Sequence, residues 1–344
     1  MDDASNSLRL DRRSLLAGAA GAALSFACRK KPSDPRVLRL GSFPNLTHAP
    51  AITGIASGRF AQALGPTRLV THSFNAGPAA VEALMAGALD ATFVGPIPAA
   101  AGFVRSHGRA LKVVSGAASG GTSFVVRRGA NIRGPSDLRG KRLAAPQIGN
   151  TQDIALRHYL STHGLAPAER GGDVQLTAIE NANIFTLFHQ GGLDGAWVPE
   201  PWASRLVLEA DGVVLVDERD LWPNRSFAIT LLVVRQAYLH DAPAPVDRLV
   251  DAAAREVRWI REHDTEARLA VSRALSAQTG RPLPADLLIA SWPRIDFTAD
   301  ALRPTVETAA RRAHALGMFP SDDLAGLFDD DRCARAVAVA GGAT

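Results

Sequence analysis

Glycine, asparagine and threonine gather at three points where the sequence predicts that a helix begins, residues 75–77, 149–151 and 180–181. The first N–H groups of a helix have no partner inside it and the helix dipole favours negative charge, so such points can hold a small anion. Glycine lets the backbone approach a ligand closely, and asparagine and threonine add neutral hydrogen bonds. Each residue taken alone is explained by helix capping, and their shared place after predicted strands favours ligand binding.

Further polar side chains follow the first predicted strand, residues 36–40. Asn45, Thr47 and His48 lie in the exit loop of this strand. A histidine in such a loop can donate a hydrogen bond to an oxyanion, although a lone loop histidine is more often simply solvated. The loop joins the candidate site because parallel strands place their exit loops at one edge of a sheet.

A repeated segment marks two more exit loops. Residues 87–98 align with residues 191–202 without a gap, and each copy runs from a helix-ending glycine through Leu-Asp and a short apolar strand to a proline-bearing loop. Glu200 can pair with an amine of a ligand or turn away from a simple anion, and Trp202 can cover an apolar tail. The candidate ligand-binding residues are therefore Asn45, Thr47, His48, Asn75, Gly77, Gly95, Pro96, Gly149, Asn150, Thr151, Asn181, Glu200 and Trp202.

Sequence signatures of catalysis are absent. The chain has no Gly-x-Ser-x-Gly elbow, no phosphate loop ending in Gly-Lys-Ser/Thr and no Gly-x-Gly-x-x-Gly. His158 and His163 are five residues apart on one predicted helix and do not share a face for a metal. With two cysteines, Cys28 and Cys333, a cysteine-cluster metal site is also excluded. We therefore expect no enzyme activity, no cofactor and no metal.

The composition is that of a globular protein. The 344 residues are 47% hydrophobic and 21% charged, which allows two lobes that each bury a core. The formal net charge is +4, but the sequence contains no basic stripe interleaved with aromatic residues. Nucleic-acid binding is therefore disfavoured.

The N-terminus has the features of an export signal. Arg12 and Arg13 precede an apolar run, residues 15–27, which is too short to span a bilayer but suits a secretory signal. The arginine pair resembles the twin-arginine export signal. Cys28 follows the run as in a lipoprotein cleavage box, so lipidation at Cys28 and ordinary cleavage near it both stay open. We expect a signal over residues 1–27, a tether over residues 28–35, and a protein in the periplasm or on the outer face of the cytoplasmic membrane.

Predicted strands alternate with predicted helices from residue 36 to residue 234, and the chain is helical in pattern from residue 246 onward. Such alternation predicts parallel sheets with crossover connections. The fold class is therefore α/β, with two lobes that each contain a mostly parallel sheet flanked by helices. A ligand is expected between the lobes, beyond the carboxyl ends of the strands.

Four segments in order carry a family resemblance that covers about residues 36–320. They are residues 137–141 (Asp-Leu-Arg-Gly-Lys), 149–151 (Gly-Asn-Thr), 193–197 (Leu-Asp-Gly-Ala-Trp) and 200–202 (Glu-Pro-Trp). This ordered set resembles the substrate-binding proteins of nitrate, sulfonate and taurine ABC importers. The resemblance implies a hinge-linked, type II periplasmic-binding-protein fold. It also implies a monomer that delivers its solute to an ABC permease and its ATPase.

The resemblance places the two crossings between lobes near residues 121–122 and 230–231. The expected division is lobe 1 over residues 36–121, lobe 2 over residues 122–230, a helical return to lobe 1 over residues 231–330, and a tail over residues 331–344.

The sequence thus predicts a receptor that closes on a small organic anion such as an aliphatic sulfonate or taurine, or on nitrate. No arginine or lysine falls in the predicted cleft loops, which favours an organic ligand with one polar head over a bare inorganic anion. Two alternatives stay open. One is a receptor for an uncharged heterocycle. The other is an enzyme on the same fold, related to thiamine pyrimidine-precursor synthesis, although the cysteine-rich motif of that family is absent.

Overall fold

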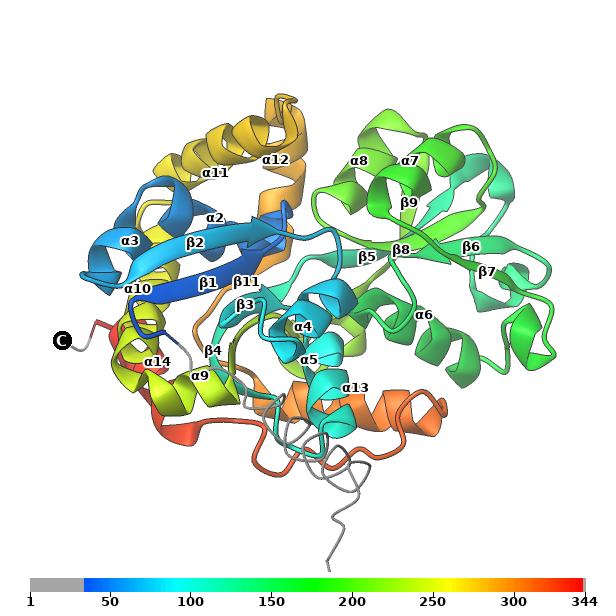
Figure 1. Ribbon diagram of the computed structural model, residues 1–344. Coiled ribbons are helices and arrows are strands. Elements are labelled where there is room, and N and C mark those ends of the chain that lie inside the picture. The colour runs from blue at the N-terminus through cyan, green and yellow to red at the C-terminus, as the bar shows by residue number, and fades with distance from the viewer. Residues whose placement is uncertain (1–33, 343–344) are drawn as a thin grey trace, which may run out of the picture. The chain divides into compact units, whose positions relative to one another are not determined.

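Two β-sheets, each packed against helices, make up residues 34–342, the part of the chain that the computed structural model describes (Figure 1). The first sheet has the strand order β11-β4-β10-β3-β1-β2 and the second has the order β7-β6-β8-β5-β9. In the first sheet the strands are β1 (Val37–Ser42), β2 (Arg68–Ser73), β3 (Ala91–Val94), β4 (Leu111–Gly120), β10 (Ala228–Arg235) and β11 (Ile295–Phe297). In the second they are β5 (Thr122–Arg127), β6 (Arg142–Ala145), β7 (Gln175–Ala178), β8 (Gly195–Pro199) and β9 (Gly212–Asp217).

The predicted two-lobed α/β fold is confirmed, with mixed rather than mostly parallel sheets. In the first sheet β1 is parallel to β2 and β3, and β10 is antiparallel to β3 and β4. In the second, β6 is parallel to β7 and β8, and β5 is antiparallel to β8 and β9. β5 and β10 follow strands of the opposite sheet, so each enters its own sheet against the direction of the neighbouring strands. We call the first sheet and its helices lobe 1, and the second sheet and its helices lobe 2.

The helices connect these strands and then cover lobe 1. Between the strands lie α2 (Ala49–Ala56), α3 (Arg59–Leu64), α4 (Gly77–Met85), α5 (Pro96–Arg105), α6 (Thr151–Thr162), α7 (Asn181–His189) and α8 (Trp202–Glu209). After β10 follow α9 (Gln236–Asp241), α10 (Pro243–Glu262), α11 (Asp264–Thr279), α12 (Ala285–Ser291), α13 (Arg303–Ala315) and α14 (Asp330–Ala340). The 3-10 helices are η1 (Leu46–His48), η2 (Arg128–Ala130), η3 (Pro135–Leu138), η4 (Ala168–Arg170), η5 (Glu218–Leu221), η6 (Pro223–Arg225) and η7 (Trp292–Arg294).

The repeated segment of the sequence corresponds to a structural duplication. When β11 is left aside, β2-β1-β3-β10-β4 in lobe 1 matches β7-β6-β8-β5-β9 in lobe 2, position by position and in relative direction. The two copies of the repeat contain β3 and β8, which occupy the central position of the five matching strands in each sheet. The two exit loops of the repeat therefore have equivalent places in the two lobes.

An aspartate of the repeat anchors the neighbouring strands in each lobe. The Asp90 carboxylate, which is almost fully buried, accepts hydrogen bonds from the Arg39 backbone N–H at 3.0 Å and from the Arg39 and Arg235 guanidinium groups at 2.8 Å. Asp194 accepts from the backbone N–H of Arg142 at 2.9 Å and pairs with its guanidinium at 3.1 Å. Charge-assisted bonds of this kind are stronger than neutral ones, so the Leu-Asp of each copy joins strands that are distant in sequence.

The chain changes from one sheet to the other at two places. Gly121 alone separates β4 from β5, and residues 218–227 separate β9 from β10. Thr230 and Leu231 lie inside β10, where they pair with β4 of lobe 1. The C-terminal helices contact both lobes, because α13 packs against α5 and α6, and α12 packs against α8.

Apolar packing forms a core in each lobe. One buried cluster extends through lobe 1 and its C-terminal helices. In lobe 2 the alternation of side chains along β8 separates two clusters, because Trp197 points to one face of the sheet and Ala196 and Val198 point to the other. Trp197 is fully buried and its indole N–H donates to Glu218 at 2.7 Å, so it packs in the core as its place in the strand predicts.

Several predictions concern residues outside the described part of the chain. The signal over residues 1–27 with Arg12 and Arg13, and lipidation at Cys28, lie there. Within residues 34–342, no helix is both long and apolar enough to cross a membrane.

Candidate ligand-binding site

A small cavity of about 30 Å³ lies where the carboxyl ends of strands from both lobes meet. A single water molecule occupies about 30 Å³ in the liquid, so the space between the lobes at this point is small. Lobe 1 contributes Phe43, Asn45, Thr47, His48, Asn75, Ala76, Gly95 and Ile229, and lobe 2 contributes Asn150, Thr151, Gln152, Asn181 and Pro199. Eight of the thirteen predicted site residues are in this set: Asn45, Thr47, His48, Asn75, Gly95, Asn150, Thr151 and Asn181.

Five helices begin at the wall of this cavity. The residues that precede α2, α4, α5 and α6 are His48, Ala76, Gly95 and Asn150, and all of them line it. Asn181, the first residue of α7, lines it as well. The N-terminal ends of five helices, where the helix dipole is positive and N–H groups lack helical partners, therefore lie at one cavity.

Three buried polar atoms of the lining have no hydrogen-bond partner among the described residues. They are His48 Nδ1, Thr151 Oγ1 and Asn181 Oδ1. The three residues are 3%, 6% and 8% exposed. A buried polar group without a partner costs about 1–3 kcal/mol, and native proteins rarely leave three together. The arrangement is explained if these atoms bind a ligand.

The electrostatic character of the cavity comes from dipoles and not from charged side chains. Among the described residues, none of those lining the cavity is an arginine, lysine, aspartate or glutamate. Burial lowers the pKa of His48 to about 3, so its imidazole is neutral at physiological pH. The site can therefore attract negative charge through helix N-termini and neutral donors.

The two lobes touch each other around the cavity. A Cβ atom added to Gly95 of lobe 1 would lie 2.5 Å from Thr151 Oγ1 of lobe 2. At the rim, Asn75 Nδ2 donates to Glu180 Oε1 across the lobes at 3.1 Å. These contacts exist only when the lobes are close together.

Comparison with known proteins identifies the family of this chain. Residues 31–276 match the model of the NMT1-like family. The chain belongs to the NMT1-like family. The taurine-binding periplasmic protein of Escherichia coli (strain K12) is 27% identical over 208 residues, which are 59% of this NMT1-like chain and 61% of that relative, less than two thirds of its length.

Two solved structures share the fold. The alkanesulfonate-binding protein SsuA from Xanthomonas axonopodis pv. citri, bound to MOPS, has a TM-score of 0.71 and 20% identity, covering 86% of this NMT1-like chain and 99% of SsuA. The periplasmic nitrate-binding protein NrtA from Synechocystis PCC 6803 has a TM-score of 0.76 and 13% identity, covering 90% of each chain. At these identities the likeness shows the fold alone.

Three predicted residues of this NMT1-like protein lie beside the cavity without lining it. Gly149 has a φ of 73°, and its N–H donates to Asp153 Oδ2 at 2.8 Å in the turn before α6. Gly77 allows α4 to approach α5, because a Cβ there would lie 2.4 Å from Pro98 Cγ. Pro96 is the first residue of α5, where its missing N–H costs nothing.

Asn150 combines the two roles that the sequence left open. Its side-chain oxygen accepts a hydrogen bond from the Thr151 N–H at 3.0 Å, so it caps α6, and it also lines the cavity. Its capping role is thus observed, and its role in ligand binding stays a prediction.

Glu200 and Trp202 lie outside the cavity. The Glu200 carboxylate is fully buried and accepts hydrogen bonds from the N–H and the hydroxyl of Ser204, at 3.0 and 3.1 Å. The Trp202 ring lies under the guanidinium of Arg205 at 5.2 Å. In this arrangement of the lobes neither side chain is placed to touch a ligand in the cavity.

Five residues of the lining were not predicted, and they differ in how far the sequence could have identified them. Ala76 and Gln152 adjoin predicted residues, and Phe43 belongs to the predicted exit loop of β1. Pro199, at the end of β8, lies in the second repeat exit. Ile229 left no signal, because an apolar residue in an apolar strand resembles any core residue.

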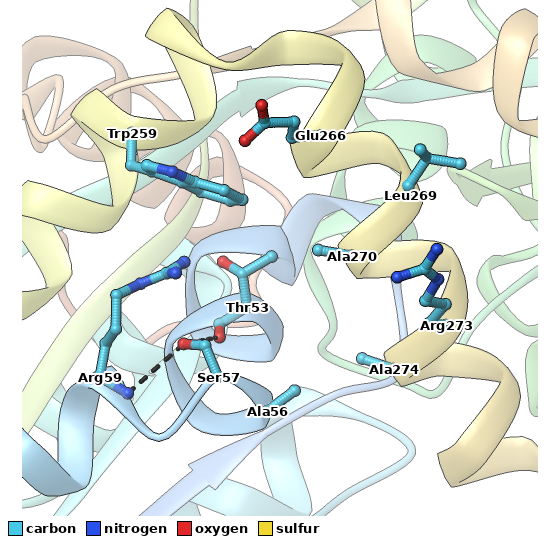
Figure 2. A pocket seen from close by; sticks show the side chains of 10 residues that line it. All are labelled: Thr53, Ala56, Ser57, Arg59, Trp259, Glu266, Leu269, Ala270, Arg273 and Ala274. Atoms are coloured by element: carbon cyan, nitrogen blue, oxygen red, sulfur yellow. Dashed lines mark hydrogen bonds between the residues drawn. The ribbon is translucent and has the colours of Figure 1, made fainter.

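A larger hollow of about 520 Å³ lies on lobe 1 beside α2 and α11 (Figure 2). Two of its polar groups have partners: the Ser57 hydroxyl donates to the Thr53 carbonyl at 2.7 Å, and the Arg59 guanidinium lies 4.3 Å from the centre of the Trp259 ring. None of the buried, unpartnered polar atoms of the described residues belongs to its lining. This hollow therefore lacks the buried, unpartnered polar atoms that indicate ligand binding in the small cavity.

A metal centre finds no support in the described residues. Across residues 34–342 no group of three or more histidine, cysteine, aspartate and glutamate side chains is placed to hold a metal ion.

Proposed function

We propose that this protein is an exported solute receptor of an ABC importer that closes its two lobes on a small anion. The ligand would be an organic anion such as an aliphatic sulfonate or taurine, or else nitrate. One observation carries the proposal: three buried polar atoms without partners line a cavity at which five helices begin. The names of the taurine-, alkanesulfonate- and nitrate-binding relatives support the same ligand class.

Binding by hinge closure follows from the size of the cavity. A space of about 30 Å³ has the volume of about one water molecule, which is less than a sulfonate or taurine occupies. The ligand must therefore enter a more open form. We propose that lobe 2 comprises residues 122–217 and that lobe 1 comprises residues 36–121 together with the chain from β10 onward, in place of the limit expected at residue 230. Closure would then occur about the two crossings between the sheets.

The partners follow from this role. We propose that an ABC permease with its ATPase receives the solute from a monomeric receptor. The receptor would act in the periplasm or on the outer face of the cytoplasmic membrane, reached through the twin-arginine-like signal and, if Cys28 is acylated, held there by lipid. Fractionation of cells, with the mass of the mature N-terminus, tests the export proposal, and recovery in the cytosol with Met1 intact would contradict it.

A thermal-shift screen tests the function, followed by calorimetry on each hit. Taurine, methanesulfonate, longer alkanesulfonates and nitrate form the anion set, and amines and vitamin precursors form the comparison set. A ligand at 100 times its Kd stabilises the folded state by about 2.7 kcal/mol, which raises the Tm of a protein of this size by roughly 5 °C. We expect such a shift with an anion, and recovery of that anion unchanged. A shift with neutral heterocycles alone, or conversion of a hit into product, would replace the proposal by one of its two alternatives.

A further inference from the structure

Glu200 connects elements of both lobes, although it lies outside the cavity. Its backbone N–H donates to the carbonyl of Gly121, the residue between β4 and β5, at 2.8 Å. Its own carbonyl accepts from the N–H of Leu46 in lobe 1 at 3.3 Å. Its carboxylate binds Ser204 of α8 in lobe 2 and lies 3.4 Å from Arg294 Nε of η7. One buried residue thus touches the crossing, the first lobe, the second lobe and the C-terminal segment.

The contact with Leu46 bears directly on the cavity. Leu46 is the first residue of η1, whose other two residues, Thr47 and His48, line the cavity. His48 also carries one of the three unpartnered polar atoms. The position of Glu200 therefore determines where this part of the cavity wall lies relative to lobe 2.

Arg294 holds the carboxylate from the side of the C-terminal segment. Its guanidinium also lies 3.5 Å from Asp217 at the end of β9, and its carbonyl accepts from the Gly121 N–H at 2.8 Å. Arg219 of η5 lies in the same group, donating to the Pro293 carbonyl at 3.3 Å. The ion pairs of Arg294 thus join η7 to the two places where the chain passes between the sheets.

We infer that Glu200 is a positioning residue. Its buried carboxyl group is fixed by Ser204 and Arg294, and its backbone carbonyl thereby holds the loop of Leu46–His48 against lobe 2. This inference rests on the proposed function only for its effect on binding, because every contact that carries it joins residues of the protein itself.

The charge of Glu200 changes near neutral pH. Burial raises the pKa of Glu200 to about 7, against the opposing effects of Ser204, Arg294 and the Ser291 hydroxyl of α12. The charged groups that face it are Arg294 of η7, Asp217 of β9 and Arg219 of η5; His48, two residues beyond Leu46, is neutral. Because the pKa is raised in the folded state, the carboxyl adds stability below its ordinary pKa of 4.5, and this contribution is lost as the pH rises to about 7.

Hydrogen exchange of the protein without ligand is the first test. We expect Glu200→Ala and Arg294→Met to increase the exchange rate of the segment 43–48 at least fivefold over wild type at the same pH, with little change in α14. Glu209→Gln, an exposed carboxylate on the same helix α8 as Ser204, is the matched control and leaves the segment unchanged. If neither Glu200→Ala nor Arg294→Met changes the exchange of segment 43–48, the inference is overturned, whether or not any anion binds.

The second test separates the charge of Glu200 from its size. Thermal unfolding of wild type and Glu200→Gln, measured between pH 5 and pH 8, should diverge, because the neutral amide removes the part of the pH dependence that belongs to this group. The same slope in both proteins would overturn the role of protonation. Affinities for taurine, methanesulfonate and nitrate at pH 5 and at pH 8 show whether the charge of Glu200 also changes ligand binding. Altered exchange together with no binding of any anion contradicts the proposed function and leaves the positioning role supported.

Discussion

Replacing Gly95 by alanine tests whether the lobes must meet at the cavity for a ligand to be held. Gly95 has a φ of −67° and a ψ of 157°, a conformation that alanine adopts without strain. The effect of the added methyl group therefore comes from what it touches. It would lie 2.5 Å from Thr151 Oγ1 of lobe 2 and 3.6 Å from the Ile229 carbonyl oxygen.

The size of the effect follows from this overlap. A distance of 2.5 Å is shorter than real Cβ atoms tolerate, so Thr151 must move or the lobes must close less far. Overpacking of a well-packed site costs about 1–3 kcal/mol. If only the closed form bears this cost, the affinity for the ligand falls roughly 5- to 150-fold, while unfolding of the open, ligand-free protein changes little.

Calorimetry with the best anion of the screen measures this loss, and two further variants show its cause. Gly134→Ala is the matched control, because Gly134 has a φ of −166° and nothing lies within 4 Å of an added Cβ. Gly95→Ala should cost less affinity in a Thr151→Ala background, since the atom it meets is then absent. Equal losses in both backgrounds, or wild-type affinity of the single variant, would refute the proposed contact between closed lobes.

Three further outcomes are expected. Thr151→Val, which keeps the shape of the side chain and removes Oγ1, should weaken anion binding by about 10- to 150-fold, which corresponds to one hydrogen bond to a charged group. Calorimetry measures the Kd, and an unchanged Kd would remove Thr151 from the site. Because the pKa of His48 falls from 6.5 to about 3 in the folded state, stability should decrease as the pH drops below 6.5, by about 3 kcal/mol at pH 4.5. Urea unfolding of His48→Gln at pH 7 and pH 4.5 should lack this slope, and an identical slope would contradict the burial of a neutral imidazole. Asp90→Ala should lower the free energy of unfolding by about 3–5 kcal/mol, because it removes the buried carboxylate that Arg39 and Arg235 both bind. A loss below 1 kcal/mol in chemical denaturation would show that the anchor is dispensable.

The sequence predicted the parts of the fold and site that depend on local pattern. The alternation of strands and helices gave the α/β class, and the repeat gave the duplication of the lobes. The sequence could place residues such as Asn150 and Gly95 near the cavity because a helix start after a strand has a local signature. The strands β5 and β10 turned two expected parallel sheets into mixed ones, because their direction depends on where the chain crosses between lobes.

Side-chain direction was beyond the reach of the sequence. Glu200 follows a strand in the same way as Gly95 does, yet its carboxylate turns to Ser204 and Arg294 instead of the cavity. The Leu-Asp of the repeat gave no hint of its arginine partners, since Arg39 and Arg235 are far from Asp90 in the chain. Ile229 could not be distinguished from a core residue until β10 was placed beside β3.

The absence of charged side chains from the described cavity lining has a consequence for how capture responds to salt. Attraction between exposed ions fades as dissolved electrolyte accumulates, whereas partial charges enclosed by protein are hardly weakened. A site made of enclosed amide, hydroxyl and imidazole groups should therefore bind its ligand with similar affinity at low and at high ionic strength. Release would then depend on the lobes being pulled apart.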